Sequence, residues 1–387
     1  MRGRRSFLKA AGIAAAGVTG AVIWRAWDQG VFSAGEGPAY SAWSTWQAAS
    51  PGPVHRMLRA AILAANPHNT QPWRFRVTPD TVDLFADHAR NIGTIDPYLR
   101  EMHIGLGCAL ENLLLAAPAC DFVPDLQLFP DSTDPVHVAR VRLRGSVQLP
   151  SALYHAIPNR HTNRGPYDGK PVPATVLEEM GKLGADLPTV AVQWITSDDA
   201  RRHVGDLIVQ ATQAIIADQE QSRDSAAWFR GNWHEVQRRR DGLTIDAQAL
   251  PVWLRTAAKV LPPVSTERAD DIWLKSTREV QVATAAAYGL IVARDTNDNA
   301  SRVAGGRLWQ RVQLYGATRG IAMQPLNQLP ERADRERSLG IEPRFGRVLD
   351  ELTKNTDWHG LMPFRLGYPT RVALPSPRRH IEEVIIA

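Results

Sequence analysis

The sequence lacks most of the features that would assign it quickly to a functional class. It has only two cysteines, Cys108 and Cys120, with no C-x-x-C pair and no clustered histidine, which argues against a disulfide framework and a thiolate metal site. It has no Gly-x-Gly-x-x-Gly, Gly-x-Ser-x-Gly or His-Glu-x-x-His motif, so the common dinucleotide, hydrolase and zinc-peptidase signatures are absent. The histidines are scattered, and we predict no metal site.

What is present is an average soluble composition with an uneven charge distribution. Hydrophobic residues make up 44% and charged residues 22% of the 387 residues, which argues against disorder and a polytopic membrane protein. The net charge is +5, but Arg2, Arg4, Arg5 and Lys9 supply four of these charges and leave about +1 for the rest. A nucleic-acid partner is therefore not predicted, because such proteins carry a basic face on the folded domain.

The N-terminus has the pattern of a targeting segment. Residues 3–9 read Gly-Arg-Arg-Ser-Phe-Leu-Lys and run into an uncharged, weakly apolar stretch at residues 10–24, shorter than the roughly 20 residues of a membrane span. The Arg-Arg-x-Phe-Leu-Lys core resembles a twin-arginine signal, which implies the export machinery as a partner and a periplasmic or other extracytoplasmic location. The alternatives are a frayed helix or a membrane anchor, the latter if the signal is not cleaved.

The body is expected to be α+β. We predict a signal segment at residues 1–33, a Gly- and Pro-rich linker at 34–53 and structured parts at 54–150 and 151–387. Periodicity predicts helices at residues 55–65, 101–117, 175–183, 200–219 and 305–320. It predicts strands at residues 73–77, 81–85, 136–143, 190–195, 288–293 and 371–374, whereas residues 228–270 look irregular. A shift of 200 residues matches Gly105 to Gly305 and Leu114 to Leu314, which hints at two copies of one unit.

Three short segments could bind a ligand. Residues 66–73 read Asn-Pro-His-Asn-Thr-Gln-Pro-Trp, a turn that presents amides and a hydroxyl suited to a flat heteroaromatic ring, or simply an Asx turn that ends a helix. Residues 160–164 read Arg-His-Thr-Asn-Arg and suit a phosphate, or form a solvated basic loop. Residues 376–380, Ser-Pro-Arg-Arg-His, leave the same two possibilities open.

Together these segments resemble the nitroreductase-like flavoproteins, and their order resembles the Acg-like branch of that family. Asn69–Trp73 matches the Asn-Thr-Gln-Pro-Trp signature, residues 160–164 the phosphate-gripping segment, residues 320–328 the stretch near flavin N5, and residues 376–379 the C-terminal basic pair. In ordinary members the phosphate motif comes first, whereas here it comes about 90 residues later. That order is what a fused pseudo-dimer with one flavin between its halves would need.

The resemblance implies a nitroreductase-like fold of two related halves, with antiparallel or mixed sheets packed by long helices, and FMN as cofactor. It implies a monomer (the pseudo-dimer) or a weak dimer. Asn327 stands where many nitroreductases have an acid, which puts hydride delivery from a nicotinamide cofactor in doubt. No catalytic side chain is implied, because the flavin carries the redox chemistry. The implied cofactor-binding residues are His68, Asn69, Thr70, Gln71, Arg160, Thr162, Arg164, Pro325, Asn327, Gln328, Arg378 and Arg379.

Two functions remain open on the sequence. The first is an exported FMN-dependent oxidoreductase that reduces a small aromatic or quinone-like acceptor. The second is an FMN-binding or storage protein whose closed site prevents turnover. The insertion at residues 228–270 is expected to be a lid in which Trp228, Trp233 and Trp253 cover the flavin, with a surface helical excursion as the alternative.

Overall fold

The computed structural model describes residues 20–48, 52–147, 149–353 and 357–386. The Arg-Arg-x-Phe-Leu-Lys motif lies outside these residues. Residues 20–28 are helical, and no helix in the described ranges is long and apolar enough to cross a membrane.

The first half of the body is a four-stranded antiparallel sheet with a long helix. Its strands run in the order β1-β2-β4-β3, and α4 connects β2 to β3. In β1, Trp73 and Phe75 are buried while Arg74 and Arg76 are not, the alternation expected of a half-buried strand. The elements are α3 (Pro53–Ala61), β1 (Trp73–Val77), β2 (Thr81–Ala86), α4 (Arg100–Ala116), β3 (Phe122–Leu128) and β4 (His137–Gly145).

The second half contains a sheet of the same plan. Its antiparallel strands run in the order β5-β8-β10-β9, and α12 connects β8 to β9 as α4 connects β2 to β3. All seven residues of β8 are buried, because helices and neighbouring strands cover it. The sheet and its helices are α5 (Ala152–Ala156), α6 (Ala174–Lys182), β5 (Val190–Ile195), α7 (Asp198–Ala217), α8 (Gln219–Ala226), β8 (Ala287–Ala293), α12 (Asn299–Thr318), β9 (Ala322–Pro325), α13 (Gln328–Leu339), α14 (Arg344–Thr353) and β10 (His359–Gly367).

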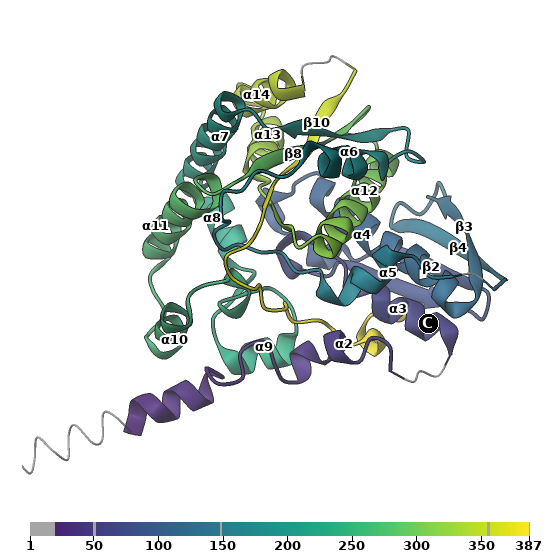
Figure 1. Ribbon diagram of the computed structural model, residues 1–387, viewed down its shortest axis with the longest axis horizontal. Coiled ribbons are helices and arrows are strands. Elements are labelled where there is room, and N and C mark those ends of the chain that lie inside the picture. Colours follow the sequence, from purple (N-terminus) through teal and green to yellow (C-terminus); the bar gives the residue numbers. More distant parts are fainter. Residues whose placement is uncertain (1–19, 49–51, 148, 354–356, 387) are drawn as a thin grey trace, which may run out of the picture.

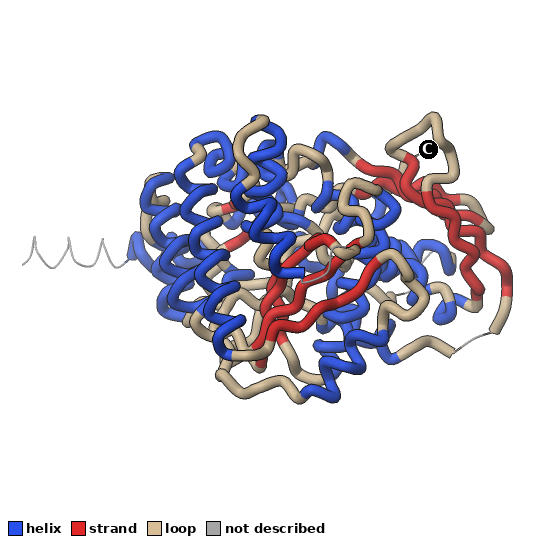
Figure 2. Tube along the Cα trace, turned by 90° about the horizontal axis from the view of Figure 1, so that it is seen from above, coloured by secondary structure: helices blue, strands red, loops and turns tan. Residues whose placement is uncertain are grey.

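Helices α4 and α12 pack against each other at the centre of the molecule (Figure 1). They cross at glycines: a Cβ on Gly107 would lie 2.1 Å from the carbonyl oxygen of Val303, and one on Gly306 would lie 2.0 Å from that of Ile104. The two contacts are equivalent, because Gly306 and Val303 each lie 199 residues after Gly107 and Ile104. This offset is one residue fewer than the shift of 200 suggested by the sequence. One apolar core runs through both halves, and Figure 2 shows the strands gathered in two separate groups.

The insertion at residues 228–270 is largely helical, so the expectation of an irregular segment is wrong. It holds β6 (Phe229–Arg230), α9 (Trp233–Arg239), β7 (Leu243–Thr244), α10 (Val252–Val260) and the start of α11 (Thr266–Ser276). Helix-start signals were present: the side chains of Asn232 and Ser265 accept hydrogen bonds from the backbone NH groups of Glu235 and Arg268.

The N-terminal segment and the C-terminal tail both pack on the body. Residues 34–48, within the expected linker, include α2 (Ser41–Ser44) and bury Ala39 and Tyr40 against α9. The tail leaves the second sheet and returns to the first, where Phe75 and Ile385 form a parallel bridge (Figure 1). The strand expected at residues 371–374 is wrong. The last strand is β10, which was not predicted because Pro363 lies inside it and a proline argues against a strand.

Candidate functional site

The loop before β1 is held in an unusual backbone conformation. His68, Asn69 and Gln71 have φ angles of 45°, 56° and 53°, although none of them is glycine. Left-handed conformations of this kind cost about 1–3 kcal/mol each and persist only where the surroundings impose them. The carboxamide of Asn66 contributes, since its Oδ1 accepts a hydrogen bond of 2.7 Å from the backbone NH of Gln71. The loop is therefore fixed, and the polar side chains of Asn69, Thr70 and Gln71 are buried within it.

Two buried arginines from distant parts of the chain converge behind this loop. Arg160 donates to Gln313 Oε1 at 3.0 Å and to the carbonyl oxygen of Leu63 at 3.1 Å. Arg378 donates to Asn69 Oδ1 at 2.5 Å and to the same Leu63 oxygen at 3.4 Å. Both residues are 3% exposed, so the shared carbonyl holds two guanidinium groups together away from water.

Within the described residues, neither guanidinium forms an ion pair with a carboxylate. Burial lowers the pKa of Arg160 to about 10, and burial together with Arg160 lowers the pKa of Arg378 well below its usual value. The Nε atoms of both residues and Nδ1 of His161 have no hydrogen-bond partner. Buried, unpaired charge is costly unless an ion of opposite charge compensates it. The arrangement therefore suits an anion that accepts several hydrogen bonds, such as a phosphate.

Trp43 covers this pair from the N-terminal segment. Its ring centroid lies 4.8 Å from the Arg378 guanidinium carbon and 5.9 Å from that of Arg160. The His161 ring lies edge-on to it at 4.5 Å, and Trp43 Nε1 donates to the carbonyl oxygen of Ser376 at 2.8 Å. Burial and the two arginines lower the pKa of His161 to about 3, so the imidazole is neutral at pH 7.

In the rest of the 160–164 segment, Arg164 contacts the insertion, whereas Asn163 Nδ2 donates to the carbonyl oxygen of Arg371 at 2.7 Å. Arg164 donates to the carbonyl oxygen of Ala247 at 3.4 Å, and burial lowers its pKa to about 10. Burial and the charge of Arg164 lower the pKa of His68 to about 4, while Thr162 is half-buried in the same segment. The charge of Arg164 acts on His68, so the segments at 66–71 and 160–164 lie near each other.

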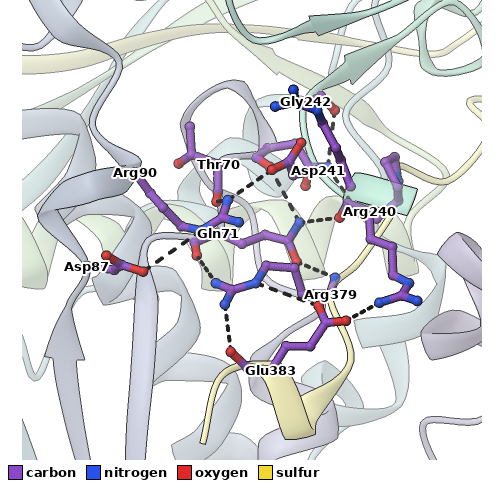
Figure 3. Close-up of polar contacts among 12 residues, drawn as sticks. Thr70, Gln71, Asp87, Arg90, Arg240, Asp241, Gly242, Arg379 and Glu383 are labelled. Atoms are coloured by element: carbon purple, nitrogen blue, oxygen red, sulfur yellow. Dashed lines mark hydrogen bonds and ion pairs between the residues drawn. The ribbon is translucent and has the colours of Figure 1, made fainter. Parts of the chain in front are cut away.

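Arg379 lies elsewhere. Its backbone NH donates to Gln71 Oε1 at 2.8 Å, and its guanidinium donates to the carbonyl oxygens of Gln71 and Glu383 (Figure 3). Burial and the charge of Arg90 lower its pKa to about 10. The structure thus brings Arg378 to Arg160, and places Arg379 on the outer side of the loop.

The insertion contacts the loop directly through its backbone. Asn69 Nδ2 donates to the carbonyl oxygen of Gly242 at 3.2 Å, and the Gly242 NH donates back to the Asn69 carbonyl at 3.1 Å. Gln71 Nε2 donates to the carbonyl oxygen of Arg240 at 2.8 Å. Asp241 fixes this stretch to the first half through an ion pair with Arg90 at 3.1 Å, and to β6 within the insertion through an ion pair with Arg230 at 2.9 Å.

The three tryptophans of the insertion do not converge on one surface. Trp253 is 71% exposed, whereas Trp233 stacks on Tyr40. Trp228 lies beside Arg90 and Arg230, with ring-to-guanidinium distances of 5.9 and 5.3 Å. The part of the insertion that contacts Asn69 and Gln71 is the 240–242 stretch, and it does so with backbone groups.

Pro325, Asn327 and Gln328 lie at the end of β9 and the start of α13. This region contacts the 160–164 segment through β9, where the Asn163 NH donates to the Met323 carbonyl. The Asn327 and Gln328 side-chain oxygens lack partners, and Asn327 interacts with Glu101. Burial raises the pKa of Glu101 to about 7 and that of Glu331, its hydrogen-bond partner, well above the usual value. This corner therefore holds buried, readily protonated carboxyl groups.

Sequence reasoning missed three residues that complete the site: Trp43, Gln313 and Arg365. Arg365 is fully buried in β10, and it donates to the carbonyl oxygen of Gly165 at 2.7 Å and to Gln324 Oε1 at 2.8 Å. It thereby fixes the 163–165 backbone against β9. The sequence signal that could have identified Arg365 is a charged residue within an apolar run. A buried arginine needs several hydrogen-bond acceptors, so such a residue indicates a structural role. No group of three or more metal-ligating side chains occurs in the described part of the chain.

Sequence comparison relates the chain to nitroreductase-like proteins of Mycobacterium tuberculosis. It is 26% identical over 336 residues to "Putative NAD(P)H nitroreductase Rv3131", which covers 86% of this chain and 90% of that protein. A stretch of 88 residues is 32% identical to "Putative NAD(P)H nitroreductase acg", covering 23% of this chain and 27% of that protein. No family model matches the chain.

Comparison of structures gives low scores. The FMN-dependent nitroreductase NfnB from Mycobacterium smegmatis, in complex with NADPH, has a TM-score of 0.37 and 17% identity and covers 61% of this chain and 97% of that chain. A nitroreductase with bound FMN from Desulfitobacterium hafniense has a TM-score of 0.36 and 12% identity, with coverage of 62% and 99%.

Proposed function

We propose that this relative of the nitroreductase-like proteins is an FMN-dependent oxidoreductase that reduces a small aromatic or quinone-like acceptor. The observation that carries the proposal is the buried pair of Arg160 and Arg378, which has no carboxylate partner and adjoins Asn69. A phosphate ester would supply the missing negative charge. The similarity to nitroreductase-like relatives over most of the chain supports FMN as the ester.

The residues present suit the different parts of FMN. Arg160, Arg378 and the free Nδ1 of His161 would hold the phosphate, which accepts hydrogen bonds from all three. The fixed loop at residues 68–71, with Thr162, Arg164 and the β9–α13 corner, would orient the ring. When bound, FMN supplies the redox chemistry. The chain supplies anchoring, orientation and exclusion of water, and no side chain is assigned as an acid or base.

One flavin per chain is part of the proposal. The two sheets share strand order, strand direction and helix position, which supports two related halves at residues 54–150 and 151–387. The anchoring residues come from both: Asn69 from the first, Arg160 and Arg378 from the second. A single chain would then form the complete site, and we propose that it acts as a monomer or a weak dimer.

We also propose export by the twin-arginine route, on the basis of the sequence at residues 3–9. Fractionation of cells expressing the full chain should find the protein outside the cytoplasm. Replacement of Arg4 and Arg5 by lysine should retain it inside, and an unchanged distribution would refute export by this route.

The purified protein provides the test of function. Flavin absorption should survive desalting, heat should release FMN in a ratio near one per chain, and NAD(P)H should be consumed when a nitroaromatic or quinone is added. A colourless protein that FMN cannot reconstitute would refute the proposal.

The second candidate is an FMN-storage protein. It is favoured by the backbone of residues 240–242, which occupies the polar groups of Asn69 and Gln71. Bound FMN without turnover of any donor and acceptor pair would support storage over reduction.

A further inference from the structure

A second cationic site lies on the outer side of the loop at residues 68–71. It is a hollow of about 550 Å³ lined by Arg74, Arg90, Arg230, Arg239 and Arg379 together with Trp228. The lining comes from the first half, the insertion and the C-terminal tail, so folding brings five arginines together from three parts of the chain. Figure 3 shows Arg90 and Arg379 projecting beside Gln71 at this place.

The positive charge of the hollow is only partly neutralised. Its lining includes two carboxylates, Asp87 and Asp241, against the five guanidinium groups. Asp241 pairs with Arg90 and Arg230, and Asp87 pairs with Arg74 at 3.0 Å. Outside the lining, Glu235 pairs with Arg239 at 3.0 Å.

Arg379 is the least neutralised of the five. Its nearest carboxylate oxygen, on Glu383, lies 3.9 Å from Nε, and the hydrogen bonds of its NH groups go to carbonyl oxygens. An anion in the hollow could therefore approach Arg379 without displacing a short ion pair.

The shape and the aromatic wall indicate an organic anion larger than a single phosphate. A volume of this size falls within the range of small-molecule sites, about 300–1,000 Å³. The half-buried indole of Trp228 offers a flat surface next to the guanidinium groups. Flat rings attached to phosphates match such a pairing of aromatic and cationic groups.

We propose that this hollow binds a phosphate-bearing organic anion with an aromatic ring, of nucleotide size. It is distinct from the Arg160–Arg378 pair, because neither of these residues lines the hollow. Arg74 and Arg239 reach the hollow with side chains that are 47% and 54% exposed, so they can adjust to a ligand without disturbing the core.

The test is calorimetric titration of the desalted protein, with whatever flavin it carries, using ADP, pyrophosphate and adenosine at low salt. ADP should bind at one site, more tightly than pyrophosphate or adenosine, and more weakly as salt increases. The double variant Arg74→Ala/Arg239→Ala should weaken ADP binding at least tenfold, and Trp228→Leu should reduce it to the level of pyrophosphate.

Two controls locate the site. Arg202→Ala removes an exposed arginine of α7 and should leave ADP affinity unchanged. Arg160→Met alters the other arginine pair and should also leave it unchanged, which separates this proposal from the proposed flavin site. The proposal is overturned if ADP does not bind at 1 mM, if the double variant binds it as well as the unmodified protein, or if adenosine or pyrophosphate binds equally well.

Discussion

Replacing Arg160 by methionine tests the central part of the proposed site. The methionine side chain is shorter, but it is unbranched and flexible and replaces the aliphatic part of arginine, and it has no charge and no donor. A charge-assisted hydrogen bond contributes about 1.5–3 kcal/mol, which corresponds to a loss of about 10- to 150-fold in FMN affinity. The Leu63 carbonyl keeps a donor in the variant, because Arg378 Nη2 already lies 3.4 Å from it.

The Arg160→Met substitution should lower the stability of the FMN complex but should not lower the stability of the apoprotein. Without an anion, the two buried guanidinium groups repel each other, so the variant apoprotein should unfold at the same or a higher temperature. With FMN at 100 times the Kd of the unmodified protein, binding adds about 2.7 kcal/mol to stability. A variant with 100-fold weaker binding would gain only about 0.4 kcal/mol at the same FMN concentration.

The assay combines titration of apoprotein with FMN and thermal unfolding with and without FMN. Arg202→Met, on the exposed face of α7, is the matched control and should behave as the unmodified protein. If Arg160→Met and Arg378→Met both bind FMN with unchanged affinity, the phosphate does not lie between these arginines.

Three further predictions test other parts of the molecule. Gly306→Ala should destabilise the protein by about 1–3 kcal/mol or more in denaturant titrations, because its Cβ would lie 2.0 Å from a backbone oxygen of α4. The control, Gly320→Ala, should cost about 1 kcal/mol, because this position is in open space but has a φ of +69°. The raised pKa of Glu101, about 7, means that the folded state binds its proton more tightly than the unfolded state. The unfolding free energy of the unmodified protein minus that of Glu101→Gln should therefore fall by up to about 3 kcal/mol from pH 4.5 to 7.5, and a flat difference would refute the buried ionisation. Deletion of residues 230–262 removes the backbone groups over Asn69 and Gln71 and should accelerate flavin reduction measured by stopped flow; an unchanged rate with FMN bound would mean that the insertion is not a lid.

The sequence predicted the parts of the fold that depend on local patterns. The first hairpin, strand β5 and helix α4 begin and end within a residue or two of the expected positions. The spacing of the apolar residues along each of these elements indicates its type. The helices of the insertion were missed although their capping residues were present. Pro363 concealed β10, since a proline argues against a strand.

The site was predictable as a set of segments but not as an arrangement. Adjacent side chains of an extended tail point to opposite sides, so the sequence alone could not tell whether Arg378 or Arg379 would face Arg160. Trp43 lies in a segment whose composition suggested a linker, and its role depends on tertiary packing. The left-handed backbone of His68, Asn69 and Gln71 is held partly by contacts with residues far away in the chain, such as those of Asn69 with Gly242 and Pro377, which local propensity does not encode.

The return of the C-terminal tail to the first sheet has a consequence for how the chain folds. The carbonyl of Leu63 and the guanidinium of Arg378 are 315 residues apart in sequence, and contacts of such high order form late because a long loop must close first. Until the tail arrives, the backbone NH and carbonyl of Phe75 in β1 lack the partners that they find in Val384 and Ile386. A nascent chain therefore exposes an open strand edge, which invites aggregation, until residues 384–386 have been synthesised and have paired with β1. If Arg378 anchors the ligand as proposed, anchoring can begin only after the tail has folded back onto the first half, so capture of the ligand would follow this late step of folding rather than guide its start.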